Sequence, residues 1–398
     1  MPGYWLNQSY CRPSATGKWD KKPGQEVSVR ARVTSLGDRL IEAGWLAAAV
    51  VVPVIFNQYA DRVFQMTKVT IFRSVTLLML AGVGIRFLGR SDRPRDRPEP
   101  DQPRVQRARD LVHHPMALAA LVLGVVYLLA TATSVLPRLS LLGSYRRLQG
   151  TYTVLGYLVL FFSVFCFLRQ GEQLDRLLTA LFITSLPVAA YAVLQHYWLD
   201  PLEWRWAVGW RAPSTLGNPI FSGAYFVMVV PLTLMRVISG VQSALRSPEE
   251  RLRFSLEAAL YLALLGLQLA ALLFTGSRGP MLALGASLFF LLFLTGTRRG
   301  SRSLLALSLI VALLAGGLLV AANVPSPISK VLSQVPYVRR LSGFLESNTV
   351  RERILIWRGA AEMLATAGWR DLVGYGPETI FYVFQPYVPS ELVERTGQ

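Results

Sequence analysis

Arginines occur in three short polar loops of an otherwise apolar chain, and arginine is the side chain best suited to holding a phosphate. Its guanidinium is planar, stays charged and donates two parallel hydrogen bonds to an oxyanion. The loops are PRLSLLGSYRRLQGTY (137–152, with Arg138, Arg146 and Arg147), the stretch 199–223 (with Arg205 and Arg211) and FTGSRGP (274–280, with Arg278). Three such loops on one face of a membrane predict a site for a lipid-linked diphosphate that needs no metal.

A break in the backbone follows Arg211. Gly217, Asn218 and Pro219 come directly before an apolar run, and glycine and proline interrupt regular structure. The first amides of a helix have no partner within it and favour anions. We therefore expect Gly217 and Asn218 to add amide donors to the same site.

The alternative for these arginines is anchorage, because arginines at the ends of membrane spans commonly reach toward the head groups. This alternative stays open for Arg138, Arg146 and Arg147, and it is favoured for Arg205. Arg211 and Arg278 lie in glycine-containing turns, which favours binding. The three tryptophans of the 199–223 loop fit an interfacial belt.

Other groups suited to catalysis are few. Asp200 and Glu203 share the loop of Arg211, where ion pairing is the simpler role. His196 is placed near the outer face and is a candidate base, although a histidine held by hydrogen bonds at a helix end is commoner. The two cysteines and three histidines have no metal-ligand spacing. We expect neither a metal nor a cofactor.

Helices must position these loops, because the composition is that of a membrane protein. Apolar residues make up 52% of the chain, charged residues 16%, and the mean hydropathy is +0.38. Apolar runs of about 17–22 residues, each long enough to cross a bilayer as a helix, recur along the chain. Nine spans are expected, at 40–56, 69–88, 116–135, 152–168, 177–197, 219–238, 256–274, 279–296 and 303–322. The second is the least secure, because it contains Arg73.

The distribution of charge orients the chain. If the N-terminus is cytoplasmic, the cytoplasmic segments carry 23 Lys and Arg, against 8 in the short loops of the other side. The positive-inside rule therefore predicts a cytoplasmic N-terminus. The same rule explains the net charge of +17, so no nucleic-acid partner is expected.

The fold class predicted is all-α, a polytopic transmembrane helical bundle. Residues 1–38 are expected as a cytoplasmic tail, and 39–322 as the bundle with a disordered, proline-rich linker at 89–115. Residues 323–398 are expected as an extracytoplasmic loop, incomplete at its end. Within that loop Ile354, Trp357, Ala361 and Leu364 recur at helical spacing, which predicts an amphipathic helix on the membrane surface or over the spans.

The sequence resembles the O-antigen ligase and polymerase family of bacterial membrane glycosyltransferases. The resemblance is carried by an ordered set of segments: WRAPSTLGNPIFSGAYFVMVVPLTL (210–234), LLFTGSRGPMLAL (272–284) and RERILIWRGAAEML followed by GYGPETIFYVFQPY (351–387). It implies transfer of a glycan from an undecaprenyl diphosphate carrier to an acceptor sugar, on a glycan or lipid, at the outer face of the inner (cytoplasmic) membrane. By position, Arg211 and Arg278 would bind the diphosphate and stabilise the leaving group.

The family's presumed catalytic histidine follows the segment that matches GYGPE, and here the chain reaches Gln398 without one. The expectation is a fragment, in which nine spans are a partial count, or a protein without its general base. It should then bind the lipid diphosphate and transfer glycan poorly. Two alternatives are a transporter or flippase of lipid-linked oligosaccharides and a non-catalytic partner in glycan export.

Overall fold

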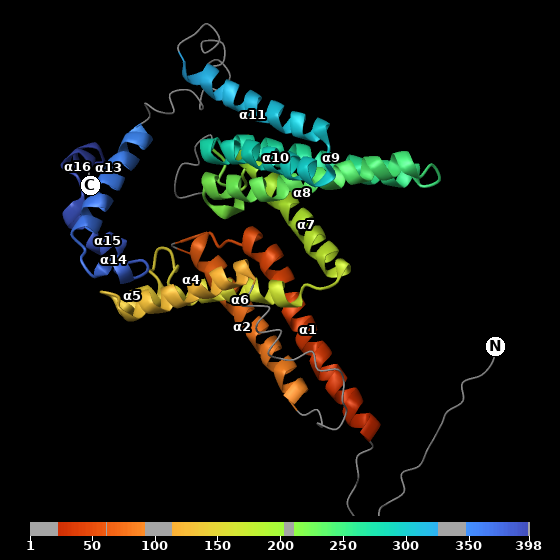
Figure 1. The fold of residues 1–398 in the computed structure, drawn as a ribbon, viewed down its shortest axis with the longest axis horizontal. Helices are drawn as coiled ribbons and strands as arrows, with labels where there is room; N and C mark the ends of the chain where they lie inside the picture. The colour runs from red at the N-terminus through yellow and green to blue at the C-terminus, as the bar shows by residue number, and fades with distance from the viewer. Residues whose placement is uncertain (1–22, 61, 92–113, 203–210, 325–347, 397–398) are drawn as a thin grey trace, which may run out of the picture.

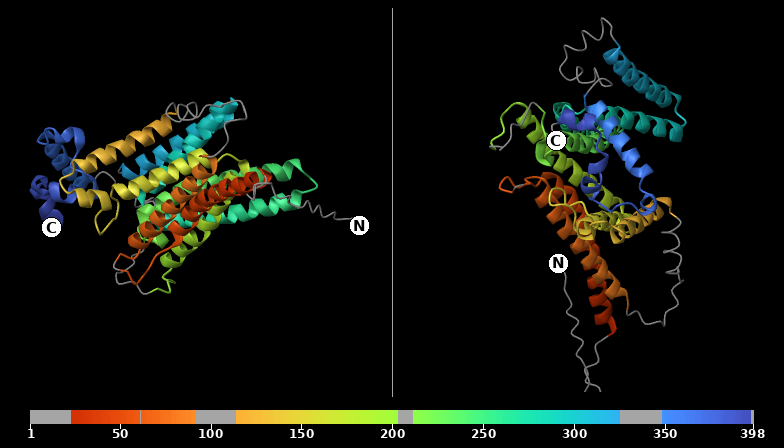
Figure 2. Two further views of the ribbon diagram at one scale, coloured as in Figure 1. Left: turned by 90° about the horizontal axis from the view of Figure 1, so that it is seen from below. Right: turned by 90° about the vertical axis from the view of Figure 1, so that its left-hand side faces the viewer.

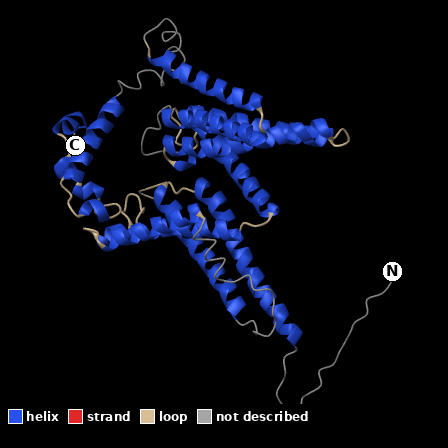
Figure 3. Cartoon of the chain, viewed as in Figure 1, coloured by secondary structure: helices blue, strands red, loops and turns tan. Residues whose placement is uncertain are grey.

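The computed structural model describes residues 23–60, 62–91, 114–202, 211–324 and 348–396. Every regular element within these ranges is a helix, and none is a strand (Figure 3). Long apolar runs favour this outcome, because a helix satisfies its own backbone hydrogen bonds in lipid. The predicted all-α class is confirmed.

Each of the nine expected spans corresponds to one helix, although four of them run a few residues past the end of their helix. These are α1 (Pro23–Val54), α2 (Gln65–Ser91), α4 (Pro115–Ala132), α6 (Thr151–Phe167), α7 (Gly171–His196), α8 (Pro219–Arg246), α9 (Arg251–Phe274), α10 (Arg278–Arg299) and α11 (Arg302–Asn323). By length and composition α2, α4, α7, α8, α9 and α10 can cross a membrane, while α6 and α11 contain shorter apolar stretches. The chain is an integral membrane protein, and the count of nine stays a prediction.

The charge within α2 is stabilised by hydrogen bonds to neutral oxygens. Arg73 Nη2 donates to Leu142 O at 2.8 Å and to Leu148 O at 3.0 Å. Arg73 Nε donates to Thr153 Oγ1 at 3.0 Å, and the guanidinium lies 4.7 Å from the ring centre of Tyr152. The expected span 69–88 therefore tolerates its arginine, because the side chain binds the neighbouring loop rather than lipid.

Two groups of helices form the core. One is centred on α1 and α2, where Trp45 and Met79 are fully buried. The other joins α7, α8 and α9 around Phe226 and Leu272. Figure 1 shows α4 and α6 beside the first group and α10 beside the second, and the views of Figure 2 agree. Successive helices run in opposite directions, so their connecting loops alternate between two ends.

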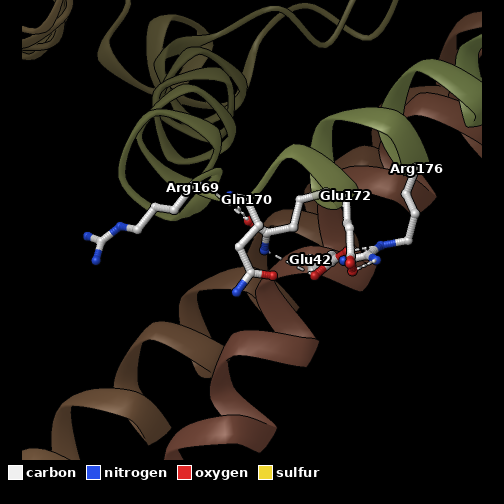
Figure 4. Close-up of polar contacts among 6 residues, drawn as sticks. Glu42, Arg169, Gln170, Glu172 and Arg176 are labelled. Carbon is white, nitrogen blue, oxygen red and sulfur yellow. Dashed lines mark hydrogen bonds and ion pairs between the residues drawn. The ribbon is translucent and has the colours of Figure 1, made fainter.

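Polar contacts join the helices at the end that the charge distribution predicts to be cytoplasmic (Figure 4). Glu42 of α1 accepts hydrogen bonds from Arg176 Nε at 2.6 Å and from Gln173 Nε2 at 3.2 Å, both on α7. Glu172 lies 3.7 Å from the same arginine. Two more ion pairs are Asp38 with Arg86 and Asp175 with Arg236. This network connects α1, α2, α7 and α8.

The C-terminal segment is helical. It contains α13 (Asn348–Ala365), α14 (Arg370–Val373), α15 (Ile380–Val383), η2 (Gln385–Tyr387) and α16 (Ser390–Thr396). The amphipathic helix expected there is α13, but its buried face differs from the expected stripe. Leu355 and Met363 are buried, whereas Ile354 is 54% and Trp357 69% exposed. The helix has two apolar faces, and the packed one contacts η2 and α16.

Some expected boundaries fall differently or outside the description. α1 begins at Pro23, so the helix extends into the stretch 1–38 that was expected as a tail. Most of the expected linker 89–115 lies outside the described residues. The division into tail, bundle and external loop stays a prediction.

Candidate functional site

The segment 211–219 is fastened to the helices around it. Ala212 N donates to Phe274 O at 3.0 Å, at the end of α9. Ser214 N donates to Gln195 Oε1 at 2.7 Å, and the Ser214 hydroxyl donates to Val188 O at 2.6 Å, both on α7. Ser214 has φ +52°, in a region that serine rarely adopts, so the surrounding bonds hold a strained backbone. The segment is therefore a fixed support for its side chains.

Arg211 binds the turn between α9 and α10. Its Nε donates to Thr275 O at 3.1 Å, and its Nη2 donates to Ser277 Oγ at 2.9 Å. A guanidinium has five N–H groups, so two bonds leave about three for a ligand. Burial lowers the pKa of the Arg211 guanidinium, which nevertheless stays charged at physiological pH. The geometry joins Arg211 to the turn that bears Arg278.

Arg278 is the first residue of α10 and follows the capping residue Ser277. Its side chain is partly exposed and has no hydrogen bond or ion pair with any part of the chain that the structure describes. The starts of α8 and α10 lie against each other, because a Cβ on Gly223 would be 2.6 Å from the side chain of Pro280. An unpartnered guanidinium thus lies where two helix N-termini meet, and N-termini favour anions.

The break before α8 forms as expected, but it frees fewer amides. Gly217 has φ +74°, and a Cβ there would collide with the ring of Phe64, so glycine is required. Asn218 caps α8, and its Oδ1 accepts from Ile220 N at 2.8 Å. Since Pro219 has no N–H, the first two positions of α8 offer no free donor. Gly217 and Asn218 shape the site more than they supply amides to it.

Lys68 is a site residue that the sequence did not single out. It is 9% exposed, and its ammonium donates to Val52 O at 2.6 Å and to Pro53 O at 3.0 Å. Thr215 Oγ1 donates to the same Pro53 O at 2.8 Å. No acid pairs with Lys68 in the described chain, so its charge adds to the positive field behind the segment 211–219. The sequence alone could not identify Lys68 as a site residue, because lysines that reach toward the head groups are common at the edge of a span.

Arg138, Arg146 and Arg147 lie elsewhere. All three are exposed, on or near the short helix α5 (Pro137–Leu142), and their side chains have no partner among the described residues. No hydrogen bond or ion pair joins them to Arg211 or to the turn 275–278 within the described ranges. The sequence led us to expect one cluster of arginines. The described contacts instead place Arg211 with the turn of Arg278, and Arg138, Arg146 and Arg147 in a different loop.

The remaining candidates have structural partners or lie outside the described residues. Arg205 and Glu203 fall in 203–210, which the structure does not describe. Asp200 accepts hydrogen bonds from the Tyr191 hydroxyl and from Gln195. His196 stacks on Phe274, with ring centres 3.8 Å apart. In the residues searched, no three His, Cys, Asp or Glu side chains could hold a metal together.

Comparison with known proteins gives one match. A family model described as O-antigen ligase matches residues 262–397, which begin within α9 and include α10, α11 and the C-terminal helices. No curated protein and no solved structure matches the chain. Arg278 lies within the matched residues, whereas Arg211 and Lys68 precede them. The resemblance of the sequence to the O-antigen ligase family is thus confirmed over residues 262–397.

Proposed function

We propose that this protein is a membrane glycosyltransferase of the O-antigen ligase and polymerase type. It moves a glycan from an undecaprenyl diphosphate carrier to an acceptor sugar during assembly of cell-envelope polysaccharide. The donor diphosphate binds between Arg211 and Arg278, with the charge of Lys68 behind it. The family match supports the reaction class, and the arrangement of these cations supports the binding mode.

The observation that carries the proposal is the fixed pairing of Arg211 with the turn of Arg278. Arg211 donates two hydrogen bonds to the 275–277 turn, and the Arg278 side chain donates none to the described residues. A structural arginine is expected to use its donors on the protein, whereas a ligand-binding arginine keeps them available. Preorganised donors of this kind stabilise charge without rearranging as it forms.

In the proposed reaction an acceptor hydroxyl oxygen attacks the anomeric carbon of the donor glycan with inversion. The bond between that carbon and the diphosphate oxygen breaks, and the electron pair leaves with the diphosphate. Arg211 and Arg278 stabilise the charge that develops on this leaving group. The hydroxyl proton passes to a base, which the arginines do not provide. Neither a metal nor a nucleotide takes part.

The site is assigned to the outer face of the inner membrane, with a cytoplasmic N-terminus, from the distribution of Lys and Arg. The partners on that face are the lipid-linked donor, a glycan or lipid acceptor, and membrane lipid. A transporter is the weaker alternative, because transporters place ionisable groups and broken helices near mid-depth. In the described spans, the unpaired cations Lys68 and Arg278 lie at helix ends instead.

Replacing Arg278 tests the proposal most cleanly, because its side chain has no described contact whose loss would disturb folding. In a chain that carries the general base, Arg278→Ala and Arg211→Ala should each lower glycan transfer about a hundredfold, the usual cost of removing one preorganised donor. Transfer is measured in membranes of cells that produce the protein, from the amount of acceptor that gains glycan.

The matched control is Arg298→Ala, an exposed arginine at the other end of α10. It should transfer glycan like the unaltered protein. All variants should insert into the membrane at equal levels. Full transfer by both Arg211→Ala and Arg278→Ala would remove the assignment of the site.

A further inference from the structure

The C-terminal segment is fastened onto the arginine loop, which we define as residues 133–150. Arg370 Nη1 donates to Thr133 O at 2.6 Å, and Val135 N donates to Tyr375 O at 3.2 Å. Figure 1 shows α14 and α15 beside α5, at the ends of α4 and α6. The segment 370–378 therefore covers one side of the arginine loop.

Three serines of the arginine loop complete this attachment. Ser134 Oγ donates to Tyr375 O at 3.2 Å, Ser140 Oγ donates to Pro377 O at 2.9 Å, and Ser144 Oγ donates to Glu378 Oε2 at 2.5 Å. Glu378 has φ +63°, a conformation that glutamate rarely adopts, and persists only where surrounding bonds impose it. Ser144 is two residues from Arg146.

The arginine loop is also held from the opposite side. Arg73 of α2 donates to the carbonyls of Leu142 and Leu148, on either side of Arg146 and Arg147. Leu148 itself has φ +54°, in the left-handed region. A loop fixed by α2 beneath it and by residues 370–378 beside it has little conformational freedom left to lose on binding a ligand.

The side chains that this fixed loop directs outward are cations. Arg138, Arg146 and Arg147 are exposed, and their side chains make no hydrogen bond or ion pair with the described residues. Arginine on a rigid backbone binds phosphate or carboxylate with a smaller entropic loss than on a mobile one. Simple anchorage to head groups would not require the loop to be bound from two directions.

The arginine loop and the Arg211–Arg278 site belong to different helix groups. The arginine loop joins α4 to α6, while Arg211 and Arg278 lie at the ends of α8, α9 and α10. Figures 1 and 2 show α5 apart from the starts of α8 and α10, although all three lie toward the same end of the molecule. A transferase needs two sites at one end, one for each substrate.

We propose that the arginine loop is a second anion site, which binds a phosphate or carboxylate on the acceptor glycan. Arg138, Arg146 and Arg147 contact the anion, and Arg370 and Glu378 are positioning residues that fix the loop. This inference rests on the proposed function, because it assigns the second substrate of the same transfer. It adds that the acceptor is anionic and binds apart from the donor diphosphate.

The test measures binding of two ligands to the purified 398-residue protein in nanodiscs. The donor probe is farnesyl diphosphate, and the acceptor probe is a phosphorylated oligosaccharide compared with its dephosphorylated form. The double variant Arg146→Gln/Arg147→Gln should weaken binding of the phosphorylated oligosaccharide at least about tenfold, the equivalent of one charge-assisted hydrogen bond. Its affinity for farnesyl diphosphate should not change.

Two controls accompany this variant. Arg298→Gln/Arg299→Gln removes another adjacent pair of exposed arginines, at the far end of α10, and should change neither affinity. Ser144→Ala leaves every arginine in place but removes the bond to Glu378. This variant should weaken binding of the phosphorylated oligosaccharide only, since the arginine loop becomes more mobile while its charge stays the same.

Equal binding of the phosphorylated and dephosphorylated oligosaccharides would overturn the inference, as would full affinity in the Arg146→Gln/Arg147→Gln variant. If the Arg146→Gln/Arg147→Gln variant bound both farnesyl diphosphate and the phosphorylated oligosaccharide more weakly, the proposal of two separate sites would be wrong. The proposed donor site fails by a different result, namely unchanged binding of farnesyl diphosphate to the Arg278→Ala variant.

Discussion

Two cationic side chains of α2, those of Arg73 and Lys68, have different roles. Arg73 places its donors on the carbonyls of Leu142 and Leu148, so it is a structural group that holds a loop. Lys68, one turn earlier, donates to Val52 O and Pro53 O and has no acid beside it in the described chain. A buried ammonium held only by carbonyls is costly, and such groups commonly serve function.

Replacing Lys68 by methionine should weaken binding of farnesyl diphosphate about tenfold, because the charge behind the segment 211–219 is lost while the apolar stem is kept. Titration of the ligand into purified protein measures the change in affinity. Thr215→Val is the matched control, since it removes the other donor to Pro53 O without altering charge. An unchanged affinity in Lys68→Met would exclude Lys68 from the donor site.

Residue spacing predicted the site in part. Arg211 and Arg278 could be singled out because glycine-containing turns place them away from plain helix ends, and the structure joins Arg211 to the turn of Arg278. Lys68 could not be distinguished from an anchoring lysine, because its burial depends on how α1 and α2 pack. The partners of the three loops could not be predicted either, since such contacts join residues far apart in the sequence.

At the scale of elements, hydropathy predicted where the helices lie. Each of the nine apolar runs corresponds to one helix, because lipid leaves the backbone few other ways to satisfy its hydrogen bonds. In the more polar segments of the chain, the predicted helix limits and buried faces were less accurate. α1 begins at Pro23, well before its apolar part, and α13 buries Leu355 and Met363 rather than the stripe of Ile354 and Trp357. Tertiary packing decided both cases.

The crossing of α8 and α10 depends on the absence of a side chain at Gly223. A Cβ there would lie 2.6 Å from Pro280, so Gly223→Ala should separate the two helix starts and displace Arg278 from Arg211. Farnesyl diphosphate should then bind about tenfold more weakly, together with a loss of thermal stability typical of an overpacked core. Gly266→Ala on α9, where nothing lies within 4 Å, is the matched control; it should leave the affinity unchanged and should not lower the thermal stability, because alanine favours a helix more than glycine does.

Retention of full affinity by Gly223→Ala would show that the relative position of α8 and α10 does not matter to the donor site. The proposed roles of Arg211 and Arg278 would then have to be independent of each other.

At the scale of the whole molecule, the two ends of the bundle differ in how charge is used. At the predicted inner end, the arginines that join one helix to another are paired with acids. Arg176 pairs with Glu42 (Figure 4), and Arg236 pairs with Asp175. At the opposite end, Lys68, Arg278 and the arginines of the 133–150 loop lack acidic partners in the described residues. Paired charges connect helices, and unpaired charges remain available to ligands.

Glu42→Gln tests this division. It should lower the thermal unfolding temperature only slightly, because an ion pair with a half-exposed arginine contributes little to stability. Glycan transfer and binding of farnesyl diphosphate should stay unchanged, since the network lies at the far end from the site. A marked loss of transfer with normal stability would contradict the separation of structural and functional charge.

The attachment of residues 370–378 to the 133–150 loop also has a consequence for biosynthesis. Its bonds join residues that are 234 to 241 positions apart in the chain. While a ribosome is still making the helices in between, the loop has already been synthesised, but residues 370–378 have not. The hydrogen bonds between this loop and residues 370–378 can form only after α13 and those residues have been synthesised. The arginine loop is therefore among the last parts of the protein to reach its final shape, and a nascent chain cannot present it fully formed.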